Sequence, residues 1–356
     1  MRAQVTLLYL FDVAEAVRLP LLASTLGTAT PDSSLAPRGA VEYQNPPLSF
    51  DGASVDAPAV DGFGRPRVRV YDYGVISLAF TRPFEGAWDE LAALGPRFID
   101  NASLDAEAEA CCRLVVERLA GALERPRETF LSEDYAVFAT IPDPGATSET
   151  VVAAHGADIA RLLRGESGTL SRQEVEEVLR HRLSYLSDDL VVPTWNAAFV
   201  CDTEPGINAV VEILEFGNSQ LLQFRYYDQR LDAELARTYA DLQREGGAYL
   251  VGSRRYTRAA RRIHSHSIDV RELVDRTENA LNFVGDVYLA RVFALIGARL
   301  GLDRWKGQVR DKLQTLDVIY HFAVEQSGIV RGELLELTII AILVLELVLF
   351  FLGIMK

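Results

Sequence analysis

The segment VRVYDYGVISLAF, Val68–Phe80, carries the clearest β-structure signal in the chain. Its valines, tyrosines and isoleucine favour strands, and Tyr73-Gly74 interrupts the run where a turn or bulge is expected. The segment therefore predicts one or two β-strands, and with them a sheet in the first part of the chain.

Similar apolar runs flank this segment on both sides. Further strands are expected at 4–11, 135–140 and 194–202, and helices at 13–25, 104–123, 148–163 and 171–183. Strands separated by helices predict an α+β fold class, with a ferredoxin-like α/β domain over residues 1–202. Within it, the stretch 28–65 is rich in Pro, Gly, Ser and Ala, so we expect a flexible loop there.

The second half of the chain has a helical pattern. Residues 206–245 contain no proline and predict one long helix, ended by Gly246-Gly247. Two more helices are expected at 269–300 and 303–330, with Gly301 at the reversal between them. Their apolar residues recur at steps of seven, or of four and three, which predicts a coiled-coil-like hairpin in a domain spanning 203–336. Core packing in an ordinary helical bundle gives the same pattern and is the alternative.

The last apolar run is LTIIAILVLELVLFFLGIM, Leu337–Met355. It is about 28 Å long as a helix, close to the thickness of the hydrocarbon layer, and is predicted to be a C-terminal transmembrane helix. The apolar run near the N-terminus is short and soon followed by Asp12 and Glu15, which does not fit a signal peptide. The expected location is therefore the inner (plasma) membrane, single-pass, with the body in the cytoplasm.

Glu346 is the one charged residue within that run. A carboxyl group at mid-depth in a bilayer is costly, so Glu346 is a candidate intramembrane contact, either specifying an oligomer or coupling to an ion. The alternative is a neutral carboxyl that hydrogen-bonds to its own backbone.

Charge restricts the partners of the chain. The net charge of −14 makes direct nucleic-acid binding unlikely. One segment is basic despite the negative net charge, because there are five arginines and no acidic residue between Gly246 and Ile268. It is a candidate patch for binding an anion or a partner. These arginines are Arg254, Arg255, Arg258, Arg261 and Arg262. Pairing with acidic faces of the same protein or its oligomer is the alternative, and it is favoured.

No catalytic pattern is recognisable. The chain lacks a phosphate-binding glycine loop, a nucleophile elbow and an HExxH motif, so no enzyme activity and no cofactor are expected. His264, His266 and Asp269 lack a convincing further metal ligand. The three cysteines, Cys111, Cys112 and Cys201, show no zinc spacing and are interpreted as buried thiols.

Several segments together resemble the "required for meiotic nuclear division" (YagE-like) family. They are VRVYDYGVISLAF, SYLSDDLVVPTWNAAFV, ILEFGNSQLLQFRYYDQRLDAEL, the hairpin from NALNFVGDVYLARVF to LQTLDVIYHF, and the final LELTIIAILVLELVLFF. The resemblance covers about residues 67–356. It points to structural roles for Asn218, Gln220, Arg225, Tyr226, Asp228, Asn282, Arg291, Trp305 and Lys312.

The resemblance implies an oligomeric inner-membrane protein linked to translation. The expected function is a membrane-anchored oligomeric scaffold or tether, with copies of itself, membrane lipid and the ribosome or another protein complex as partners. A weaker resemblance to CorA-type magnesium transporters gives the alternative, an ion-conducting or transport-regulating oligomer. CorA proteins have two membrane helices and a Gly-Met-Asn loop, which this chain does not match.

Overall fold

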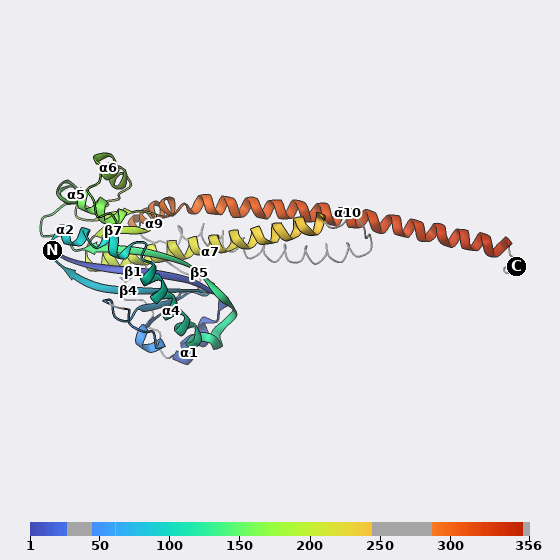
Figure 1. Cartoon of the computed structure of the whole chain (residues 1–356), viewed down its shortest axis with the longest axis horizontal. Coiled ribbons are helices and arrows are strands. Elements are labelled where there is room, and N and C mark those ends of the chain that lie inside the picture. Colours follow the sequence, from blue (N-terminus) through green and yellow to red (C-terminus); the bar gives the residue numbers. More distant parts are fainter. Residues whose placement is uncertain (27–44, 61, 244–286, 352–356) are drawn as a thin grey trace. The chain divides into compact units, whose positions relative to one another are not determined.

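The computed structural model describes residues 1–26, 45–60, 62–243 and 287–351 (Figure 1). The chain divides into two compact units. Unit 1 comprises residues 1–226 and 275–305, and unit 2 comprises residues 227–274 and 306–356.

A seven-stranded mixed sheet forms the centre of unit 1, in the order β2-β3-β4-β1-β5-β7-β6. Its strands are β1 (Arg2–Val17), β2 (Leu48–Asp51), β3 (Arg67–Val70), β4 (Val75–Glu85), β5 (Leu123–Thr140), β6 (Leu190–Pro193) and β7 (Ala197–Cys201). The long strand β1 pairs antiparallel with β4 on one side and with β5 on the other. The β5–β7 pair is parallel, so both strands end at the same edge of the sheet.

The turn between β3 and β4 depends on a glycine. Gly74 has a φ of +83°, a conformation that L side chains rarely adopt. A Cβ atom there would lie 1.9 Å from the backbone oxygen of Ala14. The predicted interruption at Tyr73-Gly74 is therefore confirmed, and it lets the turn pack directly against β1.

Both faces of the sheet are covered, which explains the nearly continuous apolar run of β1. Val5, Leu7, Tyr9 and Phe11 belong to a hydrophobic core shared with short helices and α4 and α5. These elements are α1 (Leu19–Leu26), η1 (Gly52–Val55), α2 (Trp88–Ala92), α3 (Gly95–Phe98), α4 (Ala102–Leu119), η2 (Ala120–Ala122), α5 (Ser148–Arg164) and α6 (Arg172–Arg180).

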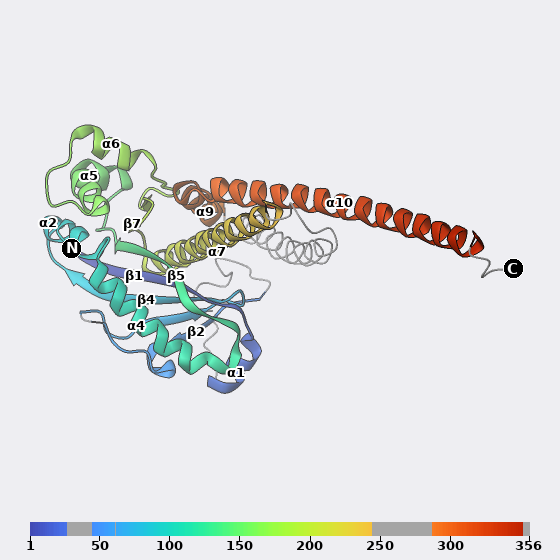
Figure 2. The ribbon, with the colours of Figure 1, turned by 45° about the vertical axis from the view of Figure 1, so that its right-hand side comes forward.

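The opposite face of the sheet packs against the first part of α7 (Glu204–Gln243) (Figure 2). α9 (Val287–Leu300) lies against β6 with Leu289, Val292, Phe293 and Ile296 buried. Gly301, at φ +67°, separates α9 from α10 (Leu302–Phe351). In unit 2, α10 buries Val309, Leu313 and Leu316, residues of the predicted heptad pattern.

The predicted ferredoxin-like architecture is wrong. Such a domain follows a βαββαβ order, whereas this sheet has seven strands and a single parallel pair. Part of the stretch 28–65 was also mispredicted, because β2 and η1 lie within it. Residues 27–44 and 61 lie outside the described part.

The predicted transmembrane helix is wrong as well. Among the described residues, no helix combines the length and the apolar character needed to cross a membrane. The described part of the predicted stretch, residues 337–351, belongs to α10, and the charged residue Glu346 interrupts its apolar run. The tail anchor and the single-pass inner-membrane location, which both rested on this helix, are corrected with it.

Candidate functional site

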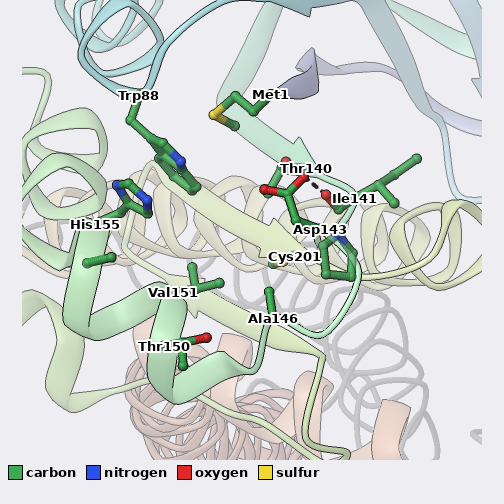
Figure 3. Close-up of a pocket in the computed structure, with 12 residues that line it drawn as sticks. Met1, Trp88, Thr140, Ile141, Asp143, Ala146, Thr150, Val151, His155 and Cys201 are labelled. Carbon is green, nitrogen blue, oxygen red and sulfur yellow. Dashed lines mark hydrogen bonds between the residues drawn. The ribbon is translucent and has the colours of Figure 1, made fainter.

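A pocket lies at the edge of the sheet where the parallel strands β5 and β7 end (Figure 3). We call it the β5–β7 pocket; its volume is about 210 Å³. The carboxyl ends of parallel strands are a common position for ligand sites, because loops and helix starts converge there. The lining residues are Met1, Trp88, Thr140, Ile141, Pro142, Asp143, Ala146, Thr150, Val151, Ala154, His155 and Cys201.

Two stacked rings form one wall of the pocket. Trp88 of α2 and His155 of α5 lie with their ring centroids 4.1 Å apart and their planes at 11°. Figure 3 shows these rings on one side and the Asp143 carboxylate on the other. The pocket thus has an aromatic wall facing a negatively charged group.

The loop between β5 and α5 is held by a helix cap. Thr147 accepts a hydrogen bond from the backbone N–H of Thr150, and Thr150 Oγ1 accepts one from the Thr147 N–H. This capping box fixes the start of α5 beside the end of β5. Asp143 precedes the cap, so its backbone is placed by the strand before it and the helix after it.

Carboxylates dominate the electrostatics around Cys201. The Cys201 thiol is 1% exposed, and burial raises its pKa to about 12. Asp202, Asp188, Asp143 and Asp189 add to this increase, because their negative charges oppose thiolate formation. The site therefore holds Cys201 as a neutral thiol and carries an excess of negative charge. The interpretation of the three cysteines as buried thiols is confirmed.

A second group of polar residues lies between the other sheet face and α7. Glu215 pairs with Arg69 at 2.7 Å and with Arg67 at 2.9 Å. Tyr73 and Ser219 share a hydrogen bond of 2.7 Å, and Gln220 Nε2 donates to the Tyr73 hydroxyl. These contacts join charged and polar groups inside an otherwise apolar layer, so they fix the register of α7 on the sheet.

Further along α7, two more contacts tie the helix to the sheet. The Arg127 guanidinium pairs with Asp12 at 2.9 Å and lies over the Tyr226 ring, with its Nη1 donating to the Tyr226 hydroxyl at 2.6 Å. Arg225 pairs with Glu133 of β5. Burial raises the pKa of the Glu133 carboxyl, and Arg225 partly offsets this increase.

The residues highlighted by the family resemblance lie at separate places. Asn218 is buried and donates from its amide nitrogen to the backbone oxygen of Leu214 within α7. In unit 2, Lys312 of α10 pairs with Asp228 at 2.6 Å and Asp232 at 2.7 Å, and the pKa of Lys312 is raised because these hydrogen bonds outweigh its partial burial. Arg291 is exposed, Trp305 is half-buried, and Asn282 lies outside the described residues.

The other predicted site residues do not join the pocket. Glu346 is exposed on α10. The five arginines (Arg254, Arg255, Arg258, Arg261 and Arg262) and the trio His264, His266 and Asp269 lie outside the described part of the chain. Within the parts that are described, no cluster of three potential metal ligands occurs.

Sequence reasoning missed the pocket residues Trp88, Asp143 and His155. One signal was available: a strand ending at Thr140 is followed by Pro-Asp-Pro-Gly and then by a helix start. The convergence of Trp88 and His155 had no such signal, because 66 intervening positions separate residues that only the tertiary fold brings together.

Comparison with known proteins places the N-terminal part of the chain in a family. No solved structure matches the chain. The uncharacterized protein MJ0711 of Methanocaldococcus jannaschii is 24% identical over 191 residues, which cover 54% of this chain and 58% of that protein. The chain thus spans somewhat more than half the length of this relative. Residues 2–208 match the family described as the N-terminal domain of uncharacterized protein MJ0711. This match takes in the whole sheet, every residue that lines the β5–β7 pocket except Met1, and the start of α7. The chain therefore belongs to the MJ0711 N-terminal domain family.

Proposed function

We propose that this protein is a homo-oligomeric scaffold, in which α10 associates with α10 of other copies. The observation that supports the proposal is a run of exposed aliphatic side chains within residues 338–348 of α10, which we call the aliphatic segment. Its seven exposed members are each 47–58% exposed: Ile339, Ile340, Ile342, Leu343, Val344, Leu345 and Val348.

The exposed side chains surround the helix. Successive residues of an α-helix are 100° apart, so Ile342, Leu343, Val344 and Leu345 point in four different directions. A helix that is apolar on all sides is stable in water only when neighbours cover it. One partner helix covers a single stripe, so the segment requires at least two, and the proposed assembly is a bundle of three or more chains.

Other copies of this chain fit better than a charged partner. The aliphatic segment contains one ionic group, Glu346, and no basic residue, so it offers no charge pattern for a partner of opposite sign. Each copy of the chain supplies an identical aliphatic segment, so the segments of neighbouring copies match in length. Burying the exposed half of seven side chains contributes about 1 kcal/mol each, which is comparable with the roughly 4–15 kcal/mol cost of association.

The partner that we propose for this scaffold is the translation machinery. This element of the proposal rests on the sequence resemblance alone. The net charge of −14 favours contact with a protein surface over contact with RNA. Co-sedimentation with purified ribosomes tests this element, and a chain that stays at the top of the gradient at low salt refutes it. The ion-conducting alternative requires a helix that crosses a membrane, and none of the described helices has the necessary length and apolar character. We therefore do not propose it.

Sedimentation velocity over a wide range of protein concentrations tests self-association. The expected result is a concentration-dependent species with the mass of three or more chains. A protein that remains a monomer of 39.4 kDa at the highest concentration refutes the proposal.

A further inference from the structure

We infer that the β5–β7 pocket binds a small organic cation: an aliphatic ammonium with a short carbon chain. The inference concerns unit 1 and is independent of self-association through α10. It rests on the pocket's volume, its apolar and aromatic walls, and the charge around it.

The pocket has room for such a ligand. Its volume of about 210 Å³ holds several water molecules or a ligand of similar size, since each water takes about 30 Å³ of liquid volume. Ile141, which is 53% exposed, lines the pocket together with Val151 and Ala146, and these side chains provide an apolar lining for a carbon chain. The edge of the Trp88–His155 stack extends this apolar surface.

The charge selects a cation. Asp143 lines the pocket, and Asp188, Asp189 and Asp202 act on the buried Cys201 thiol at its inner wall. Among the lining residues one ammonium group occurs, at the N-terminus of Met1, and it already donates to the backbone oxygen of Gly86 at 3.0 Å. One lining carboxylate, with three more close enough to act on Cys201, outweighs one engaged ammonium and leaves a negative field, which a bound cation would offset.

The buried polar groups of the wall complete the site. Thr140 Oγ1 donates to the backbone oxygen of Arg2, so its lone pairs remain available as acceptors. The Cys201 thiol, 1% exposed, faces the same space, and no hydrogen bond to it is found among the described residues. An ammonium group donates up to three hydrogen bonds, which matches a site rich in acceptors.

Isothermal titration calorimetry with 1,4-diaminobutane tests the inference. Two matched ligands of the same chain length, 1-butanol and butyrate, separate charge from size. We expect the diamine to bind and the neutral and anionic ligands to give no measurable heat. No binding of the diamine, or equal binding of butyrate through the start of α5, overturns the inference.

Variants locate the binding. Asp143→Asn should weaken diamine binding about two- to fivefold, because an ion pair at an exposed carboxylate contributes modestly. Trp88→Leu should weaken it further by removing one wall. Glu149→Gln is the matched control, since this exposed carboxylate lies on the first turn of α5 and does not line the pocket. Circular dichroism confirms folding, and equal weakening by Glu149→Gln would show that only the general charge matters and would overturn the site.

Discussion

Nη1 of Arg69 donates to the Glu215 carboxylate at 2.7 Å, and neither side chain is more than 1% exposed. The pair joins β3 to α7 through the interior of unit 1. Charged groups in such a place are costly to leave unpaired, because the interior solvates them poorly.

The loss of one member of this pair should destabilise the protein strongly. We expect Glu215→Gln to lower the free energy of unfolding by about 3–5 kcal/mol, because Arg69 keeps its charge without the matching carboxylate. Urea denaturation measures the change. Replacing both residues, Arg69→Met with Glu215→Leu, should recover part of the loss.

An exposed ion pair provides the control. Arg172 and Glu176 of α6 pair at 2.8 Å, with side chains 94% and 61% exposed. Glu176→Gln should change stability by less than about 1 kcal/mol. A similar loss for Glu176→Gln and Glu215→Gln would contradict the role assigned to the buried pair.

Gly74 and Gly145 separate backbone strain from close packing. Both have a positive φ, +83° and +85°, but a Cβ at Gly74 would lie 1.9 Å from the Ala14 oxygen whereas at Gly145 it would meet nothing within 4 Å. Gly145→Ala should cost about 1 kcal/mol of stability. Gly74→Ala should cost clearly more, and thermal unfolding of the two variants measures the difference. Equal shifts in Tm would show that the close approach to β1 has no energetic weight.

The sequence predicts the apolar elements of this fold better than the polar ones. The strand expected at 4–11 lies in β1, and the strand expected at 135–140 is the last third of β5. The first part of β5, with its run ERPRET, is largely exposed and lacks an apolar pattern, so local reasoning does not detect it. Composition is also insufficient for the end of α10, where a locally apolar run predicts a membrane span that the structure does not support.

The candidate site was beyond local reasoning for a topological reason. Met1, Trp88, His155 and Cys201 meet only because β5 and β7 run parallel and end at one edge of the sheet. Parallel pairing joins strands that are distant in sequence, and no spacing rule predicts which strands will be neighbours. The polar contacts of α7 likewise place Glu215 against Arg69, which precedes it by 146 residues.

The pH dependence of stability should reflect Asp202, which follows β7. Burial is the largest cause of the raised pKa of its carboxyl, ordinarily 3.8, and Asp189 and Asp188 raise it further. Between the ordinary and the raised pKa, the folded state keeps a proton that the unfolded state has lost. Stability from this group is therefore present at low pH and is lost as the pH rises through the folded-state pKa.

The variant Asp202→Asn should reduce this dependence of the free energy of unfolding on pH. The asparagine oxygen can still accept the hydrogen bond that Thr203 N donates to Asp202 at 2.6 Å, so the fold is expected to persist. Free energies of unfolding from urea titrations, taken from pH 4 upward, should fall less steeply with pH than in the unmodified protein. Identical slopes would show that Asp202 titrates alike in the folded and unfolded states.

Self-association should depend on the aliphatic segment rather than on exposed apolar residues in general. The double variant Ile340→Glu, Val344→Glu places two charges one helical turn apart in that segment. We expect it to sediment as a monomer, because burying both carboxylates in a bundle costs more than the lost aliphatic contacts supply. Val318→Glu is the matched control, since Val318 is 62% exposed on the same helix but lies outside the segment.

Replacing Glu346, the one charged residue of the aliphatic segment, by leucine should have the opposite effect on self-association. Glu346 lies seven residues after Ile339, on the same side of α10, so a bundle that covers Ile339 also covers Glu346. Glu346→Leu should therefore strengthen the oligomer, shifting the concentration of half-association downward by about 30-fold for a bundle of three chains if burial of each carboxylate costs about 1.4 kcal/mol. If this variant associates more weakly than the unmodified chain, Glu346 makes a favourable contact between copies, and the carboxylate contributes to the specificity of the bundle rather than opposing its formation.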